Sequence, residues 1–284
     1  MKFSKPIEEI IESRISRRTY KKDSIDAKVL GKLSDLIKEP FVGPLDGKSR
    51  FIIVDKEPLN SDEKIRIGTY GMIIGAKNFI VGIIDKNENK LEDFGYNFEK
   101  IILKSSEIGL DTCWLGAKFT GRDFEKKANI LGNEYIPAIS PIGYALDNPD
   151  ARESILSWGI KARKRKAWSR LFFSNNFGTS LEKLDNDTYS RALEMVRIAP
   201  SARNEQPWRI VRDSNDNYHF YIHLRLKRKE VRITTLKRID LGIAMCHFDL
   251  TLQERGIHGK WFVDDPKINT EKSNLYYISS WSRK

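Results

Sequence analysis

Two hydrophobic patterns alternate along the chain: apolar residues at helical spacing, and short runs that are apolar throughout. The first pattern is typical of an amphipathic helix and the second of a buried strand between turn signals. Helices are therefore predicted over residues 6–14, 26–37, 62–76, 94–108, 122–131, 189–198 and 236–254. Strands are predicted over residues 50–55, 79–84, 112–116, 136–145, 208–212, 218–224, 259–263 and 274–281.

Polar residues and glycines mark where several helices begin and end. Asp26 is suited to cap a helix because its carboxylate can accept backbone N–H groups of the first turn. Gly109 and Gly256 follow two long helices and can take the left-handed conformation that stops a helix. The segment 179–182 resembles a capping box. Five residues of helix 26–37 are predicted to face inward: Val29, Leu30, Leu33, Leu36 and Ile37.

The second part of the chain repeats the order of elements in the first part. Residues 98–115 form a long helix that ends in Glu-Ile-Gly-Leu before a tryptophan-bearing strand, and they resemble residues 239–262, where the helix ends in Glu-Arg-Gly-Ile. Residues 30–54 resemble residues 189–211 as helix, loop and strand. Such units are common in mixed folds, which is the alternative explanation, but two similarities in the same order indicate a fused dimer.

These elements predict an α+β fold with a mixed sheet flanked by helices and built from two diverged half-repeats. The predicted boundaries are a first half over residues 1–150, a basic connecting segment over residues 151–179 and a second half over residues 180–284.

Composition narrows the class of protein. A chain of 284 residues that is 40% hydrophobic can bury a substantial core, and its net charge of +11 favours nucleic acid, a membrane surface or phosphorylated small molecules as partners. Its two cysteines, Cys113 and Cys246, are too few for a disulfide framework and indicate a reducing cytoplasm. No secretory signal is expected in residues 1–10, which are charged, and the apolar stretch 72–84 is too short to span a bilayer.

The stretch from Ala199 to Trp208 is the strongest candidate for chemistry. Pro200 pushes the preceding residue out of helical space, so the helix should end there. Ser201 and Ala202 are small enough to let a flat ligand lie against the backbone, and the amide of Asn204 can both donate and accept hydrogen bonds. An ordinary helix-to-strand connection is the alternative.

This stretch resembles the Pro-Ser-Ser-x-Asn-x-Gln-Pro-Trp segment of the FMN-dependent nitroreductase family. Residues 14–20, Arg-Ile-Ser-Arg-Arg-Thr-Tyr, resemble the basic N-terminal motif of that family. The family forms homodimers with FMN between the subunits, each supplying one motif. Here the first half keeps only the basic motif, because its loop has become Pro-Phe-Val-Gly-Pro over residues 40–44, and the second half keeps only the loop. The resemblance thus implies a single-chain branch that mimics the homodimer, with one flavin site, as a monomer or weak homodimer.

The resemblance also implies roles for thirteen residues. Arg14, Ser16, Arg163 and Arg165 would hold the FMN phosphate, and Arg18 would place positive charge near the pyrimidine edge of the flavin. Thr69 and Tyr70 would lie near the flavin edge, and Trp114 and Gly116 in the segment that offers a backbone N–H to flavin N5. Pro200, Ser201, Ala202 and Asn204 form the loop contributed by the other half.

The implied activity is electron transfer from NAD(P)H, through FMN, to a small electron-poor acceptor of the nitroaromatic or quinone type. No catalytic side chain is expected, because the flavin carries the chemistry. No metal site is expected either, since His219 and His223 flank a strand-like run and fit a structural pair better than a zinc site. Two alternatives remain: a polyanion- or nucleic-acid-binding protein using the basic run 161–170, which we favour less, and a flavin-binding protein without turnover.

Overall fold

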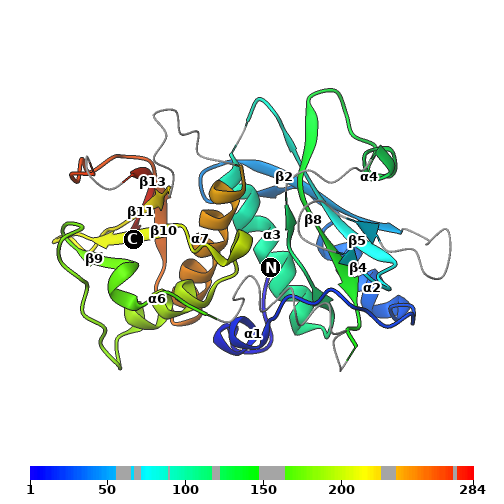
Figure 1. Ribbon diagram of the computed structural model, residues 1–284, viewed down its shortest axis with the longest axis horizontal. Helices are drawn as coiled ribbons and strands as arrows, with labels where there is room; N and C mark the ends of the chain where they lie inside the picture. Colours follow the sequence, from blue (N-terminus) through cyan, green and yellow to red (C-terminus); the bar gives the residue numbers. More distant parts are fainter. Residues whose placement is uncertain are drawn as a thin grey trace.

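The computed structural model describes residues 1–55, 65–66, 72–88, 90–116, 122–146, 164–224, 235–270 and 274–284. Two β-sheets lie on either side of a central pair of helices, α3 (Leu91–Glu107) and α7 (Thr235–Glu254), as Figure 1 shows. The predicted α+β class is confirmed. The arrangement also places the two longest helices between two sheets, where each helix buries side chains on nearly all of its faces.

The first sheet is antiparallel throughout, in the order β1-β2-β5-β8-β6, with β7 also paired to β8. Its central strand β5 is buried on both faces: Phe79, Val81 and Ile83 pack on the outer side, and Ile80 and Ile84 pack toward the central helices. Burial on both faces explains why residues 79–84 of this strand are all apolar or glycine. The strands are β1 (Phe41–Val42), β2 (Lys48–Asp55), β5 (Asn78–Asp85), β6 (Asp111–Thr112), β7 (Leu115–Gly116) and β8 (Glu134–Gly143).

The second sheet has the order β12-β13-β11-β10-β9, and only the β9–β10 pair is parallel. The path β10-β11-β13-β12 repeats the path β2-β5-β8-β7 of the first sheet, strand for strand and in the same antiparallel sense. The strands are β9 (Phe172–Ser174), β10 (Trp208–Arg212), β11 (Tyr218–His223), β12 (Gly259–Phe262) and β13 (Leu275–Arg283).

The remaining helices are α1 (Ile7–Ser13), α2 (Ala27–Leu36), α4 (Arg122–Lys127) and α6 (Thr188–Ile198), with short 3-10 turns η2 (Trp168–Arg170) and η3 (Ala202–Asn204). Helix α1 buries three isoleucines against α3, α6 and α7. The predicted cap of α2 is confirmed, because the Asp26 carboxylate accepts hydrogen bonds from the N–H groups of Lys28 and Val29. Gly109 and Gly256 adopt positive φ after α3 and α7, as expected.

Two glycines let α3 and α7 approach backbone to backbone. A Cβ atom on Gly95 would lie 2.3 Å from the carbonyl oxygen of Ile239, and a Cβ atom on Gly242 would lie 2.0 Å from the carbonyl oxygen of Glu92. Gly242 follows Gly95 by 147 positions, and Ile239 follows Glu92 by the same 147. Each helix therefore makes with its partner the contact that the partner makes with it, which is the pattern of an isologous dimer interface.

Four local predictions were wrong. The described part of segment 62–76 forms β3 (Ile65–Arg66) and β4 (Met72–Ile73) instead of a helix, and Ile74 pairs with the 18–20 segment. Segment 179–182 caps no helix, because Asp187 caps α6 by accepting from the Ser190 N–H. Leu36 is exposed at the end of α2 instead of facing inward, and α4 ends at Lys127 instead of continuing to residue 131.

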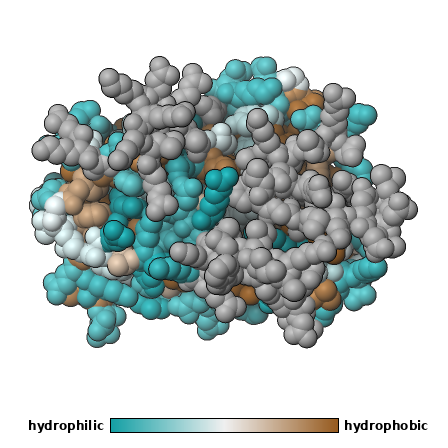
Figure 2. All heavy atoms as spheres, viewed as in Figure 1, coloured by the Kyte–Doolittle hydropathy of each residue, from teal (hydrophilic) through white to brown (hydrophobic). Residues whose placement is uncertain are grey.

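One continuous hydrophobic core joins the two sheets through the central helices. It contains Ile80 of the first sheet, Phe98 of α3, Phe248 of α7 and Phe220 of the second sheet. The described residues on the face shown in Figure 2 are mostly hydrophilic, with small, separate hydrophobic patches. The two halves therefore share one interior, which the sequence similarity between them did not by itself require.

Candidate functional site

The basic N-terminal motif lies along one end of the first sheet. Ser16 forms a parallel bridge with Thr112, and the Arg17 N–H donates a 2.9 Å hydrogen bond to the Thr112 carbonyl. Further along, the carbonyl of Arg18 accepts from the Ile74 N–H and the Tyr20 N–H donates to the Ile74 carbonyl, both at 2.9 Å. These bonds fix the backbone of residues 16–20, and the Arg18 side chain is buried.

The loop after α6 has an unusual backbone. Helix α6 ends at Ile198, before Pro200 as the sequence predicts. Arg203, Asn204 and Gln206 all adopt positive φ, of 53°, 53° and 45°. A residue other than glycine costs on the order of 1 kcal/mol in this conformation, and such strain persists where surrounding contacts impose it, often at functional sites. One of these contacts is a 2.9 Å hydrogen bond from the Gln206 N–H to Ser201 Oγ.

The basic segment 164–166 is bound to this loop. Asn204 Nδ2 donates to the Lys164 carbonyl at 2.7 Å, and the Lys166 N–H donates to Gln206 Oε1 at 2.7 Å. The guanidinium of Arg165 donates to the Ile198 carbonyl at 2.9 Å and to Asn204 Oδ1 at 3.3 Å. The side-chain amides of the loop thus hold the chain that connects the two halves.

Positive charge accumulates where the N-terminal motif meets this segment. Burial, together with the nearby charges of Arg14 and Arg197, lowers the pKa of Arg165 to about 10. Arg197 is neutralised by a two-pronged ion pair with Glu194, with contacts of 2.9 and 3.0 Å at Nε. Arg14 has no such neutralising carboxylate among the described ion pairs, and its Nη1 is buried without a hydrogen-bond partner in the described part of the chain. Two like charges, one of them incompletely bonded, form a site that favours an anion.

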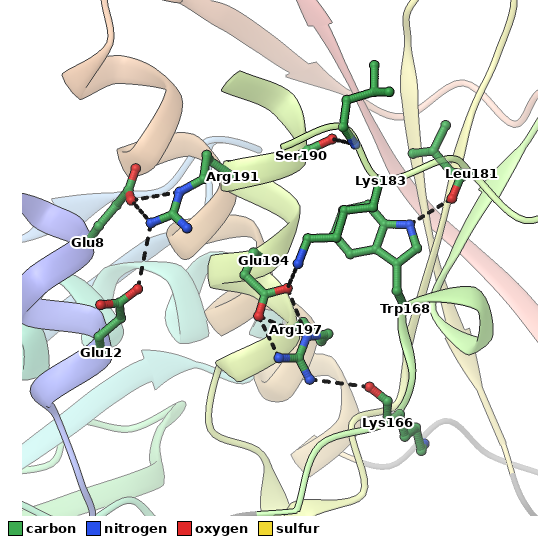
Figure 3. A network of polar contacts seen from close by, with 11 residues as sticks. Glu8, Glu12, Lys166, Trp168, Leu181, Lys183, Ser190, Arg191, Glu194 and Arg197 are labelled. Atoms are coloured by element: carbon green, nitrogen blue, oxygen red, sulfur yellow. Dashed lines mark hydrogen bonds and ion pairs between the residues drawn. The ribbon is translucent and has the colours of Figure 1, made fainter. Parts of the chain in front are cut away.

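Figure 3 shows the polar network on the α6 side of this site. Glu194 receives hydrogen bonds from Arg197 and Lys183, and Arg197 Nη1 also reaches the Lys166 carbonyl at 3.5 Å. One turn away, Arg191 pairs with Glu8 and Glu12 of α1. The network ties α1 of the first half to α6 of the second half, and so helps to fix Arg14, the residue that follows α1.

The first turns of α7 contact both walls of the candidate site. A Cβ atom on Gly116 would lie 2.4 Å from Leu236 Cδ2, so β7 of the first half lies against the start of α7. Lys237 forms an ion pair with Glu205 of the strained loop. One turn later, Asp240 Oδ1 accepts a 2.9 Å hydrogen bond from the Ala202 N–H. Asp240 is buried, and burial raises the pKa of its carboxyl from 3.8 to about 7.

A buried pair, Glu99 and His247, connects the segment around Trp114 to helix α6. Glu99 of α3 accepts from Trp114 Nε1 at 2.6 Å and pairs with His247 Nε2 at 2.9 Å. The other ring nitrogen of His247 lies 2.9 Å from the carbonyl of Met195 on α6, so it must carry a proton. Because Glu99 and His247 are both buried, the chain Trp114–Glu99–His247–Met195 holds residues 113–116 at a fixed position relative to α6.

The structure thus brings together most of the predicted site residues that it describes. Arg14 lies near Arg165, which contacts Asn204. Ala202 and Gly116 contact neighbouring turns of α7. Ser16 is paired with Thr112, two residues before Trp114. Thr69, Tyr70 and Arg163 lie outside the described residues. Whether these residues hold a flavin stays a prediction.

Four further residues of the site, Asp240, Glu99, His247 and Arg197, belong to neither of the two sequence motifs. A signal for Asp240 was present, because it follows Asp93 by the same 147 positions that separate Gly95 from Gly242. No sequence signal pointed to the Glu99–His247 pair, since its two members lie on different helices and have no matching pair in the repeat.

Metal-binding side chains do not gather in the described part of the chain: no group of three or more His, Cys, Asp or Glu residues there could hold a metal ion. His219 contacts Ser280 Oγ at 2.7 Å and Asp213 Oδ2 at 3.1 Å. His223 instead donates its backbone N–H to the Pro207 carbonyl. The His219 side chain thus makes hydrogen bonds within the second sheet, as the expected structural histidine would.

Comparison with known protein families shows the family of this chain. Residues 6–252 match the model of the family described as "Putative TM nitroreductase". The chain belongs to this nitroreductase family. A comparison with curated proteins found no match. None of the described helices of this nitroreductase-family protein has the length and apolar character needed to cross a membrane.

One solved structure shares the fold over nearly the whole chain, and others are similar to about half of it. A "putative nitroreductase" from Thermotoga maritima has a TM-score of 0.59 at 21% identity, over 99% of this chain and 94% of the other. A nitroreductase family protein from Clostridium novyi has a TM-score of 0.39 at 23% identity, over 54% of this chain and 92% of the other. A nitroreductase with bound FMN from Desulfitobacterium hafniense has a TM-score of 0.40 at 18% identity, over 52% of this chain and 93% of the other. The Thermotoga protein thus matches the two-sheet architecture along its whole length.

Proposed function

We propose that the protein is an FMN-dependent oxidoreductase that passes electrons from NAD(P)H to an electron-poor acceptor of the nitroaromatic or quinone type. Membership of the nitroreductase family supports redox chemistry. The acceptor and the nicotinamide donor follow from the family resemblance of the two sequence motifs.

The observation that carries this proposal is the Arg14–Arg165 pair. Arg14 comes from the first half and Arg165 from the segment bound to the second-half loop, yet their charges lie close enough to lower the pKa of Arg165. Arg14 Nη1 is buried and lacks a partner in the described part of the chain. A phosphate group would accept from that N–H and offset the repulsion between the two guanidinium groups. The residues therefore fit a cofactor with a phosphate.

The family resemblance assigns the remaining residues of the motifs to the rest of an FMN molecule. We propose that Ser16 and Arg163 complete the phosphate site, that Arg18 lies near the pyrimidine edge, and that Thr69 and Tyr70 approach the flavin edge. The loop Pro200–Asn204 and the segment with Trp114 and Gly116 would form two walls held by α7 and by the Glu99–His247 pair. When bound, the flavin supplies hydride and electron transfer, while the chain binds and orients it.

The contacts of Arg165 and Lys166 argue against the polyanion alternative. Lys166 Nζ donates to the carbonyls of Glu205 and Gln206, at 2.5 and 2.9 Å, and Arg165 is bonded to the loop. These two cations are turned toward their own chain instead of lining a surface for nucleic acid. We also propose that a single chain suffices, as a monomer that mimics a dimer, because both halves of the site come from one polypeptide.

The visible spectrum of the purified protein, followed by titration with FMN, tests the proposal. Retained or added FMN should give the absorption of oxidised flavin, and NADH or NADPH should bleach it. A colourless protein that does not bind added FMN would contradict the proposal. Bound FMN that neither nucleotide reduces would favour a flavin-binding protein without turnover, and retention on DNA at low salt would favour the polyanion alternative.

A further inference from the structure

Two aspartates at equivalent positions of the central helices are bonded differently. Asp93 of α3 and Asp240 of α7 are 147 positions apart, and each accepts backbone N–H groups from the loop that precedes β2 or β10. Asp93 uses both oxygens: Oδ1 accepts from Leu45 at 2.9 Å and Oδ2 accepts from Gly47 at 2.6 Å. Asp240 uses only Oδ1, toward Ala202, and its buried Oδ2 has no hydrogen-bond partner among the described residues.

The difference matters because a buried carboxyl oxygen without a partner is costly. Leaving such a group unsatisfied costs about 1–3 kcal/mol, so native proteins rarely do it without a reason. Only 4% of the Asp240 surface is exposed, so bulk solvent does not supply the missing donor. The loop preceding β2 satisfies its aspartate completely, whereas the strained loop preceding β10 leaves one position unfilled.

The unfilled position lies between the two proposed walls of the flavin site. On the same face of α7, one turn before Asp240, Leu236 contacts the Gly116 position of β7. Asp240 itself contacts Ala202 of the loop. Two charged groups act on the pKa of this carboxyl, Lys237 of α7 lowering it and Glu205 of the loop raising it, and these two form an ion pair with each other. A donor for Oδ2 is therefore most readily supplied by the molecule that the site binds.

Resting on the proposed function, we infer that Asp240 is a flavin-binding residue whose Oδ2 accepts a hydrogen bond from an N–H or O–H group of the bound cofactor. The bond would fill the position that Gly47 fills for Asp93. It would also make the strained loop and the ligand depend on one carboxyl group. In this role Asp240 binds and orients the cofactor, and it passes neither a proton nor an electron to the flavin.

The inferred bond predicts a link between flavin affinity and pH. Burial raises the pKa of Asp240 to about 7. A hydrogen bond donated to the carboxylate stabilises the charged form, so the pKa should fall when flavin binds. Binding then releases a proton, and affinity should rise between about pH 6 and pH 8. The FMN phosphate also titrates at about pH 6. The pH dependence of FMN affinity must therefore be compared with that of a variant that lacks the Asp240 charge.

The experiment measures the Kd of FMN by quenching of flavin fluorescence, for the wild type, Asp240→Asn and Asp93→Asn, between pH 5.5 and about pH 8.5, the window that brackets the Asp240 pKa. We expect Asp240→Asn to weaken binding about tenfold or more at the upper end, with a smaller loss at the lower end. Asp93→Asn, the matched control, should leave the Kd unchanged, because its carboxylate serves only its own loop. Thermal melting of each apoprotein shows which variants are folded.

Each outcome decides a different claim. If the wild type binds no FMN, the proposed function fails and the inference fails with it. If the wild type binds FMN and Asp240→Asn binds it equally well at every pH, only the inference is overturned. If Asp240→Asn does not fold, the wild-type affinity for riboflavin, which lacks the phosphate, decides: a rise with pH supports the inference and a flat profile overturns it.

Discussion

The two halves of the molecule share a framework but differ where a ligand would bind. Their sheets have the same strand order, and α3 and α7 make reciprocal contacts at Gly95 and Gly242. The loop after α2 is closed on itself around Asp93, with every carboxyl oxygen bonded. The loop after α6 is strained and is bound to the basic segment. It donates no hydrogen bond to Asp240 Oδ2, which has no partner in the described part of the chain. The two halves thus share their strand order and helix contacts, whereas the two equivalent aspartates differ in how their carboxyl oxygens are bonded.

The largest expected effect tests the shared framework. Replacing Gly242 by alanine would put a Cβ atom 2.0 Å from the Glu92 carbonyl, and Gly95→Ala would put one 2.3 Å from the Ile239 carbonyl. The clash is with backbone atoms, and a shift of a whole helix would be needed to relieve it. Each change should therefore lower the free energy of unfolding by about 4 kcal/mol or prevent folding. Urea unfolding measures the effect.

The control for these variants is Gly31→Ala in α2, where an added Cβ meets nothing within 4 Å. This change should raise stability by about 0.5–1 kcal/mol, because alanine favours the helix. If Gly95→Ala and Gly242→Ala differed by more than about 2 kcal/mol, beyond the usual scatter of such effects, the reciprocity would not hold in solution.

The next effect tests a feature that only one copy has. The positions equivalent to Glu99 and His247 in the other helix are Cys246 and Lys100, so the buried pair is not repeated. His247→Ala removes the partner of Glu99 Oε1, while Trp114 still donates to Oε2, and should cost about 3 kcal/mol because a buried pair is broken. Fluorescence of Trp114, which donates to Glu99, should also change. A cost below about 0.5 kcal/mol would show that the pair does not hold the two walls together.

Much of this framework could be predicted from the sequence, because most elements carry a strong local pattern. Residues 79–84 of β5 form an apolar run, α2 begins after a capping aspartate, and α7 is followed by Gly256. Segment 62–76 was predicted as a helix because its periodicity was ambiguous, and the pairing of Ile74 with residues 18–20 depends on a distant part of the chain. Asp187 caps α6 where Thr179 was expected to begin a capping box.

The candidate site could be predicted only in part. The two motifs identified Arg14 and the 199–206 loop, because their residue types carry the family resemblance. The contacts that join them depend on tertiary structure: Arg165 reaching Ile198, Asp240 reaching Ala202 and Glu99 reaching His247 link residues that are far apart along the chain. Local periodicity contains no information about such contacts.

A smaller effect separates the two aspartates by pH. Burial raises the pKa of Asp93 to about 6 and that of Asp240 to about 7, both from 3.8. The folded state therefore binds these protons more tightly than the unfolded state does, and stability falls as pH rises from about 4 to 6 or 7 and is level above. Asp240→Asn should flatten this slope because asparagine does not titrate in this range. It should cost little stability, because the amide oxygen of asparagine can still accept from the Ala202 N–H.

Asp93→Asn should also remove its part of the slope, but it should cost about 1–2 kcal/mol, because one of two backbone N–H groups loses its acceptor. Chemical unfolding at several pH values distinguishes the variants. Equal stability losses for both, at all pH values, would contradict the proposed difference in bonding between the two halves.

The central claim is that Arg14 and Arg165, from separate parts of the chain, bind the phosphate of one flavin. The most direct measurement compares the Kd values of FMN and riboflavin for the wild type and for Arg14→Ala, with Arg212→Ala as the control because Arg212 pairs with Asp216, away from the proposed site. The account predicts that Arg14→Ala weakens FMN binding by about 10–100-fold and leaves riboflavin binding unchanged. Equal affinity of Arg14→Ala and wild type for FMN, or equal losses for both flavins, would contradict it.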